Sequence, residues 1–112
     1  MLAKVNRLVR ADDYRAVVRR GARSRTAHTI VYILQNGRQR PSRFGFIVSR
    51  TVGNAVKRNL VRRRLKAASY GILGIVASGT DIVIRAIPGA DGAPWAVLLD
   101  EVSGVIDGMG KR

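Results

Sequence analysis

Basic residues recur at helical spacing in the middle of the chain, with no acid among them. Arg58, Arg62 and Lys66 are four residues apart, and Asn59 and Arg63 form the neighbouring row. Residues at this spacing lie one above another on a single helix face. Like charges stacked in this way repel by roughly 0.2–0.5 kcal/mol per pair. A bound polyanion would offset that repulsion, so the spacing predicts a phosphate-binding face.

Groups that could catalyse a reaction unaided are sparse. The chain has one histidine, no cysteine and seven Asp and Glu residues. The acids lie at Asp12 and Asp13 and from Asp81 to Asp107, away from the basic run. A nuclease needs a base, a nucleophile or metal-binding carboxylates within reach of one another. We therefore expect a binding protein without catalytic residues or a metal site, in which His28 has a surface or packing role.

The elements around the basic run would position it. An apolar stripe on the same helix is expected to face the core; it comprises Val56, Leu60, Val61, Leu65 and Ala68. Residues Phe44–Ser49 read as a strand, Arg50–Gly53 as the turn out of it, and Asn54 as the helix N-cap. Free N–H groups at that helix start, beside Arg50, suit a phosphate.

The composition sets the class of protein. With 112 residues and a formal net charge of +14, the chain is expected to form one nucleic-acid-binding domain over residues 1–112. The lack of cysteine excludes disulfides. No apolar run reaches about 18 residues, the length that would span a membrane. Residues Met1–Lys4 lack the apolar region of a signal peptide, so a cytoplasmic location is expected.

Before the basic run, the pattern predicts a helix and a strand. The helix would begin near Ala11, capped by Asp12 or Asp13, and end at Gly21. A β-branched strand would cover Thr26–Gln35, with alternate residues on one face: His28, Ile30, Tyr32 and Leu34. A turn at Asn36-Gly37 would let it pair antiparallel with the strand over Phe44–Ser49.

After the basic run, residues 71–79 could extend the helix or form a packed connector. Asp81–Ile87 reads as a mostly buried strand. A last helix would start at Pro94 and bury one stripe: Trp95, Leu98 or Leu99, Val102 and Ile106. The order helix, strands, basic helix, strand, helix indicates a single-domain α+β sandwich with helices packed against one sheet.

Two stretches resemble the bacterial ribonuclease P protein subunit. From position 43 the chain reads Arg-Phe-Gly-Phe-x-Val-Ser-Arg-x-Val-Gly-Asn-Ala-Val-x-Arg-Asn-x-x-Arg-Arg-x-x-Lys. From position 7 it reads Arg-Leu-x-x-x-Asp-Asp-Tyr-x-x-Val-Val-x-x-Gly. The resemblance implies a mixed sheet whose crossover through the basic helix is left-handed, the rare hand for this connection. It also implies a subunit of an endoribonuclease that matures the 5′ end of tRNA.

The resemblance further implies how the subunit works. The partner RNA would be the catalyst, and magnesium would belong to the holoenzyme, held mainly by that RNA. The partners would be ribonuclease P RNA and the 5′ leader of precursor tRNA, with no obligatory protein partner. Residues expected to meet the RNA are Arg58, Asn59, Arg62, Arg63 and Lys66, flanked by Arg50 and Lys57. Residues expected to line the leader cleft are Tyr14, Val18 and Tyr32.

Three departures from the family pattern affect these expectations. Leu60 and Thr51 each replace a basic residue, which removes one phosphate contact apiece, and Val18 replaces an aromatic one. The two tyrosines also have an alternative role, because a ring at such spacing packs in a core as readily as it stacks on a base. A small basic ribosomal or other structural RNA-binding protein is the alternative function. An architectural DNA-binding protein would need a dimer seam or an apolar wedge, and neither is visible.

Overall fold

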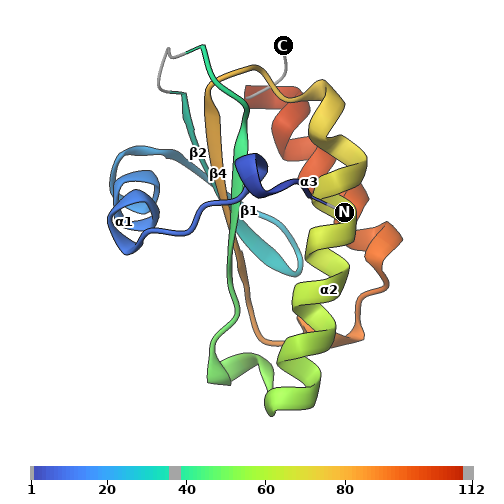
Figure 1. Cartoon of the computed structure of the whole chain (residues 1–112). Helices are drawn as coiled ribbons and strands as arrows, with labels where there is room; N and C mark the ends of the chain where they lie inside the picture. The colour runs from blue at the N-terminus through green and yellow to red at the C-terminus, as the bar shows by residue number, and fades with distance from the viewer. Residues whose placement is uncertain (1, 36–38, 110–112) are drawn as a thin grey trace.

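The computed structural model describes residues 2–35 and 39–109, which form three layers (Figure 1). Helix α1 covers one face of a sheet, and α2 and α3 cover the other. The helices and strands are α1 (Ala11–Arg20), β1 (Ala22–Arg25), β2 (Thr29–Gln35), β3 (Arg43–Ile47), α2 (Ala55–Ile72), β4 (Thr80–Ala86) and α3 (Trp95–Met109). Four 3-10 turns accompany them: η1 (Lys4–Asn6), η2 (Arg50–Val52), η3 (Leu73–Ile75) and η4 (Ala90–Gly92).

The strand order is β1-β2-β4-β3, and the expected pairing of β2 with β3 is wrong. Strand β4 lies between them, antiparallel to β2 and parallel to β3. Its central residues Ile82, Val83 and Ile84 are apolar on both faces and have no exposed surface. A strand that is apolar on both faces is stable only where both faces are covered, and this places β4 inside the sheet. The Asn36-Gly37 turn lies outside the described residues.

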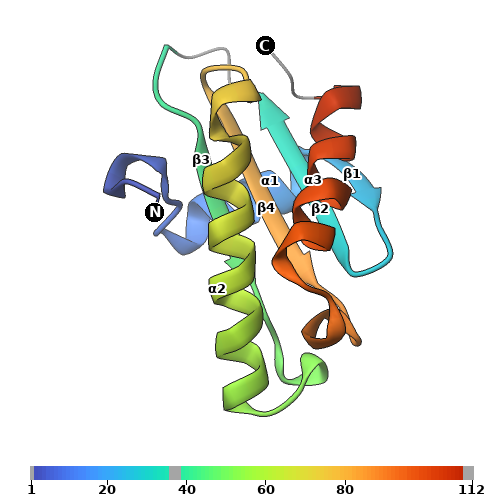
Figure 2. The same ribbon diagram turned by 90° about the vertical axis from the view of Figure 1, so that its right-hand side faces the viewer.

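The crossover from β3 through α2 to β4 is left-handed, as expected. Seen from the α2 side with both strands running downward, β4 lies to the right of β3 (Figure 2). With the strands turned to point upward, the second strand is therefore on the left, the reverse of the usual arrangement. Helix α2 consequently packs beside the β3 edge of the sheet, and α3 packs across β2.

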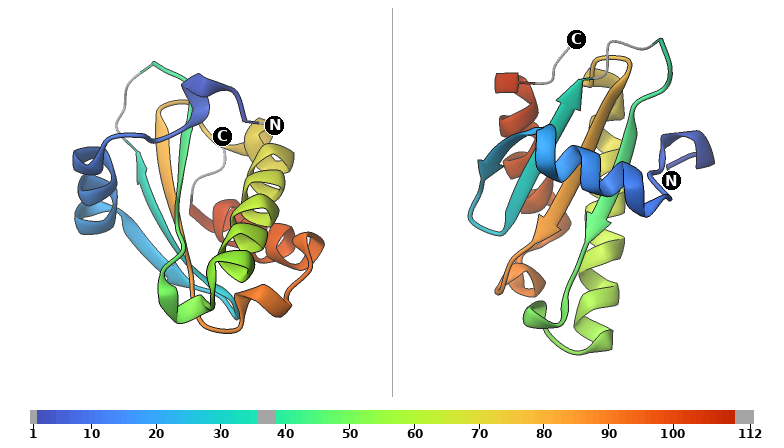
Figure 3. Two further views of the ribbon diagram at one scale, coloured as in Figure 1. Left: turned by 60° about the horizontal axis from the view of Figure 1, so that its bottom comes forward. Right: turned by 90° about the vertical axis from the view of Figure 1, so that its left-hand side faces the viewer.

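The sheet separates two apolar clusters. Successive residues of β2 point to opposite faces of the sheet, so they belong alternately to one cluster and the other. Ile30 and Tyr32 face α1, in a cluster with Leu8, Val17 and Val83. The alternate residues of β2 face α2 and α3 and belong to the larger core: Val31 and Ile33. Helix α1 crosses the sheet over the first cluster (Figure 3, right). The shared face expected for Ile30, Tyr32 and Leu34 is confirmed, but His28 lies before β2 and contacts Glu101 of α3, so its expected place on this face is wrong.

Helix α1 spans the expected residues, but the expected cap is wrong. The N-cap residue is Arg10, without a side-chain cap hydrogen bond, and Asp12 and Asp13 lie inside the first turn. There their charge favours the helix dipole without capping it. The polar strand β1 was not expected, and the next strand begins only at Thr29. Strand β1 forms the edge of the sheet, where charged residues are common.

Gly21 ends α1 for a steric reason. Its φ of −74° is accessible to any residue, so no left-handed cap is involved. A Cβ at this position would lie 2.5 Å from the carbonyl oxygen of Val17 and 2.9 Å from that of Ile33. Only glycine allows the helix end to approach β2 this closely.

Residues 71–79 were expected either to extend the basic helix or to form a packed connector. Helix α2 continues through Ile72 and is followed by η3, so residues 71–75 extend the helical region. In α3, three residues of the expected stripe have no exposed surface: Leu98, Val102 and Ile106. Trp95 is 51% exposed, and its expected core position is wrong. Ala90 and Ala93 already fill the core before α3 begins, so its first turn projects outward.

Candidate nucleic-acid interface

The turn that starts α2 has the expected form. Residues of η2 lead to Gly53, whose φ of 153° lies in the region that favours glycine. The Asn54 side chain then accepts a hydrogen bond of 3.0 Å from the Lys57 backbone N–H, which confirms the N-cap. Arg50 is exposed on this turn, immediately before the helix.

The underside of α2 anchors the helix. Val61, Leu65 and Ala68 are at most 1% exposed, and Leu60 is half-buried. Val56 is 77% exposed, contrary to its expected core position, because the first turn of α2 extends beyond the sheet (Figure 2). With this stripe fixed on the core, four of the expected RNA-binding residues on the helix are exposed and two are half-buried. The exposed ones are Lys57, Asn59, Arg63 and Lys66; the half-buried ones are Arg58 and Arg62.

Arg62 is held in a defined direction. Its guanidinium donates to the Asn59 side-chain oxygen at 3.0 Å and to the Val48 carbonyl at 3.4 Å. These bonds point the side chain toward β3 and leave it at the surface, with N–H groups to spare. The Nε of Arg58 is buried and has no hydrogen-bond partner among the described residues. Asn59 thus positions Arg62, a role that charge spacing alone does not indicate.

Two other basic residues of α2, Arg64 and Lys57, are directed toward η4 and Asp91. Arg64 donates to the carbonyls of Asp91 and Ala93, at 3.0 and 2.8 Å, and so joins α2 to η4. Lys57 Nζ lies 3.8 Å from the Asp91 carboxylate, an exposed pair worth at most about 1 kcal/mol. The cationic run is therefore divided between a structural side, with Lys57 and Arg64, and an open side, with Asn59, Arg62, Arg63 and Lys66.

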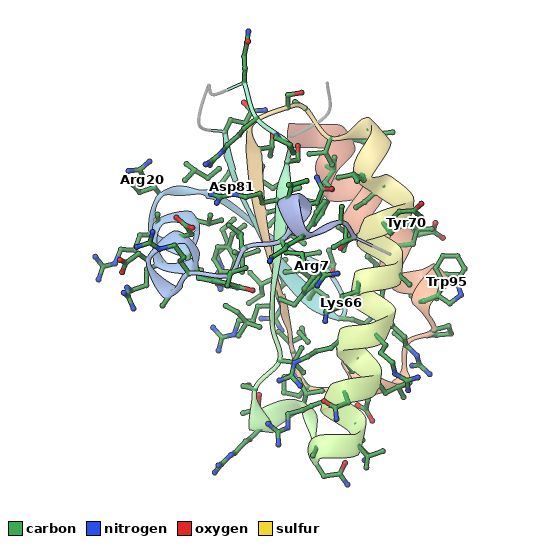
Figure 4. The ribbon with its side chains drawn as sticks, viewed as in Figure 1. Arg7, Arg20, Lys66, Tyr70, Asp81 and Trp95 are labelled. Carbon is green, nitrogen blue, oxygen red and sulfur yellow. The ribbon has the colours of Figure 1, made fainter. Side chains whose placement is uncertain are left out.

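The N-terminal arm, residues 2–10, adds a cation to the open side of α2. Asn6 donates to the Ser42 carbonyl at 2.8 Å, and the Leu8 N–H donates to the Phe44 carbonyl at 2.8 Å. These bonds seat the arm along β3 and bring Arg7 close to Lys66 (Figure 4). Three basic residues mark this arm in the sequence, Lys4, Arg7 and Arg10, but they do not indicate where it lies. Pairing across more than thirty residues has no local signal that could have revealed this position.

A groove of about 350 Å³ runs between the arm and α2, and Tyr14 belongs to it. Its polar and aromatic lining includes Arg7, Tyr14, Phe46, Arg62 and Lys66. The Tyr14 hydroxyl accepts a hydrogen bond of 3.1 Å from the Phe46 N–H. The ring lies so close to β3 that a Cβ on Gly45 would be 2.5 Å from it. A glycine inside a strand often marks such a close approach.

The expected leader-cleft residues are only partly brought together. Tyr14 and Val18 border a shallow hollow of about 280 Å³, together with Ile47 and two arginines of α1. Tyr32 lies beneath this surface, in the cluster with Val17 and Val83, and is 6% exposed. The accessible ring in this region is therefore that of Tyr14.

Among the residues that the structure describes, one carboxylate is strongly buried, and its partners give it a structural role. Asp81, 3% exposed, accepts hydrogen bonds from Arg40 at 2.9 Å and from Arg43 at 2.8 and 3.0 Å. Asp13 of α1 lies 3.4 Å from Arg43 on the other side. The hydrogen bonds to Asp81 raise the pKa of Arg43, and burial opposes this effect only in part. These charges neutralise one another and tie α1, β3 and β4 together.

Elsewhere in residues 2–35 and 39–109, no three His, Cys, Asp or Glu side chains are grouped as a metal site. His28 Nδ1 lies 2.7 Å from one oxygen of the Glu101 carboxylate, which accepts the hydrogen bond, and the Thr26 hydroxyl donates to the other oxygen at 3.0 Å. These contacts attach the start of β2 to α3, in line with a packing role. Among the described helices, none is long and apolar enough to cross a membrane.

Comparisons with known proteins agree with this geometry. The family model described as Ribonuclease P matches residues 2–110. The ribonuclease P protein component of Clavibacter michiganensis subsp. michiganensis is 50% identical over 106 residues, which is 95% of this chain and 94% of the relative. That of Arthrobacter sp. is 42% identical over 112 residues, 100% of this chain and 82% of the relative.

Two solved structures show the same fold. The Staphylococcus aureus RNase P protein has a TM-score of 0.83 at 21% identity, covering 97% of this chain and 100% of the other. The Thermotoga maritima RNase P protein has a TM-score of 0.79 at 20% identity, covering 92% and 96%. Matches over nearly the whole chain disfavour the ribosomal and architectural alternatives. The chain belongs to the bacterial ribonuclease P protein family.

Proposed function

We propose that this chain, as the protein component of ribonuclease P, binds the RNase P RNA through the open side of α2 and leaves bond cleavage to that RNA. The observation that supports this role is the separation of charge described above. Exposed cations gather on α2 and its preceding turn, whereas the buried carboxylate Asp81 is engaged with arginines. Phosphate contacts of this kind position an RNA and dominate its affinity.

The 5′ leader of precursor tRNA is proposed to lie along the hollows that meet at Tyr14. The groove beside Arg62 and the hollow beside Val18 share this residue, so a single strand could pass from one to the other. The half-buried Tyr14 ring offers a surface for stacking a base. Tyr32 would support the floor of this path. Val18 supplies an apolar contact without a second aromatic platform.

Magnesium is proposed to act in the holoenzyme, held mainly by the RNA. A cationic protein surface lowers the repulsion between phosphates that are brought together, so less of the metal is needed for assembly. The protein contribution would thus be electrostatic and positional.

The test is cleavage of precursor tRNA by the chain alone, by its RNA alone and by the mixture, across a magnesium titration. The chain alone should not cleave, and its addition to the RNA should lower the magnesium concentration needed for 5′ maturation. Cleavage by the protein that persists after rigorous removal of RNA would contradict the proposal. An unchanged magnesium requirement would contradict the electrostatic role.

A further inference from the structure

A second cavity, of about 430 Å³, lies between the N-terminal arm and the C-terminal half of α2. Six residues line it: Leu2, Arg7, Arg63, Lys66, Ala67 and Tyr70. Its volume falls within the roughly 300–1,000 Å³ of small-ligand sites. The hollow beside Val18 on the proposed leader path is lined by α1 and β3, and neither element lines this cavity.

The lining combines one aromatic ring with three cations. Tyr70 is 56% exposed and lies one helical turn beyond Lys66, and both side chains line the cavity. Arg7 closes the opposite wall, where its guanidinium donates to the Leu2 carbonyl at 2.8 and 3.1 Å. Ala67 leaves space between the walls, and no acid lines the cavity.

This combination suits a nucleotide whose base is unstacked. A base can lie on the tyrosine ring while its neighbouring phosphates meet the cations. A base inside a duplex has both faces covered and could not enter, whereas unpaired bases are the usual targets of RNA recognition. A purely apolar partner would leave three cations desolvated, which is costly.

The neighbouring surface indicates the source of that nucleotide. The cavity shares Leu2, Arg7 and Lys66 with the groove beside Arg62, so it continues the basic side of α2. The hollow at Val18 lies at the other end of this surface, beyond Tyr14. An RNA that covers the open side of α2 therefore reaches the Tyr70 cavity before it reaches the hollow at Val18.

We propose that the Tyr70 cavity binds one unpaired nucleotide of the RNase P RNA, with its base on Tyr70 and its phosphates at Arg7, Arg63 and Lys66. This inference rests on the proposed function, because it assumes that the open side of α2 meets that RNA.

The test compares aromatic variants in binding to the RNase P RNA. Tyr70→Ala should weaken binding about 5- to 150-fold, the change that corresponds to the roughly 1–3 kcal/mol of one base stack. Tyr70→Phe keeps the ring and should bind within about twofold of the parent. Trp95→Ala is the matched control, since Trp95 is similarly exposed at 51% but does not line the cavity. It should leave the affinity unchanged, and thermal melts verify that each variant is folded.

Two further arms separate the possible failures. With p-benzoylphenylalanine in place of Tyr70, irradiation of the holoenzyme bound to precursor tRNA should cross-link an unpaired nucleotide of the RNase P RNA. Cross-linking to the leader instead would overturn the inference. If Arg62→Ala weakens RNA binding while Tyr70→Ala does not, the cavity assignment fails and the proposed function stands. If neither variant weakens binding, the proposed RNA face of α2 fails as well.

Discussion

Arg62 and Arg64 are two residues apart on α2, so their side chains are directed to opposite sides of the helix. Arg62 rests on Asn59 and the Val48 carbonyl, at the edge of the open groove. Arg64 donates to two backbone carbonyls near η4. Charge alone would assign both to RNA, whereas helical spacing and their hydrogen-bond partners distinguish them.

We predict that Arg62→Ala and Arg64→Ala have different effects. Loss of Arg62 should weaken binding to the RNase P RNA and reduce the slope of log affinity against log salt by about one contact. Loss of Arg64 should lower the free energy of unfolding by about 1–3 kcal/mol, because two carbonyls lose a charged donor. Salt-dependent binding and urea denaturation of both variants make the comparison. Equal losses of RNA affinity, with equal stability, would contradict this division.

The two tyrosines near α1 should also differ. Tyr14→Ala should weaken binding of precursor tRNA to the holoenzyme by about 1–3 kcal/mol and leave mature tRNA, which lacks a leader, unaffected. Tyr32→Ala should instead lower the free energy of unfolding by about 3–5 kcal/mol, because its ring is buried beside Val17 and Val83.

Tyr32→Phe is the control, since it keeps the packed ring and removes only the hydroxyl. A selective loss of precursor binding in Tyr32→Phe, at unchanged stability, would give Tyr32 a direct leader contact through that hydroxyl. Equal loss of both tRNAs in Tyr14→Ala would contradict the leader path at Tyr14.

At the scale of elements, the contact between α1 and β3 depends on Gly45. We predict that Gly45→Ala lowers the free energy of unfolding by about 1–3 kcal/mol, because the new methyl group would lie 2.5 Å from the Tyr14 ring. The displaced ring would also weaken precursor binding. Urea denaturation and precursor affinity measure the two effects.

Gly71→Ala provides the matched control for this substitution. Gly71 lies in α2, and its added Cβ would meet only Leu99 Cδ1, at the ordinary contact distance of 3.5 Å. Alanine is a better helix former, so this change should stabilise the fold by about 0.4–1 kcal/mol. Similar destabilisation by both substitutions would show that the close Tyr14 contact is not the cause.

Local patterns predicted most elements, because each rests on a local period or cap. The alternation in β2, the cap at Asn54 and the stripe Leu98, Val102, Ile106 all have such signals. The strand order could not be predicted from these local signals, because β4 lies between β2 and β3 through pairing of residues that are far apart in the sequence. The resemblance to the family supplied the crossover hand, which no spacing encodes. Trp95 was misplaced because helical period alone does not show where a sheet ends.

The basic residues of the site could be predicted from their spacing, but the shape of the surface that they form could not. The basic row on α2 could be identified from spacing, but the position of Arg7 beside Lys66 depends on the arm pairing with β3. Likewise, burial of Tyr32 depends on where α1 crosses the sheet. Gly45, between two phenylalanines of one strand, is a local signal of such a close approach.

For the whole molecule, the separation of charge has a structural basis. Asp81 and Asp13 meet Arg40 and Arg43, while Asp91 lies against Lys57 and its carbonyl accepts from Arg64. Most of these contacts lie away from the groove beside Arg62. Part of the +14 charge therefore remains on the surface along α2 and the arm, and exposed arginines of α1 and β1 carry a further part: Arg19, Arg20, Arg23 and Arg25.

The exposed positive charge on α2 and the arm predicts a steep response of RNA binding to salt. If the protein meets about six to ten phosphates, its affinity for the RNase P RNA should fall roughly 10³- to 10⁵-fold between about 50 and 200 mM salt, because condensed counterions are released on binding. Filter binding at constant magnesium measures the slope, and Trp95→Ala, which changes no charge, should reproduce it. Arg62→Ala should be shallower by about one contact. A flat response in the parent chain would mean that the basic side of α2 faces solvent in the holoenzyme, since contacts without phosphates release no counterions.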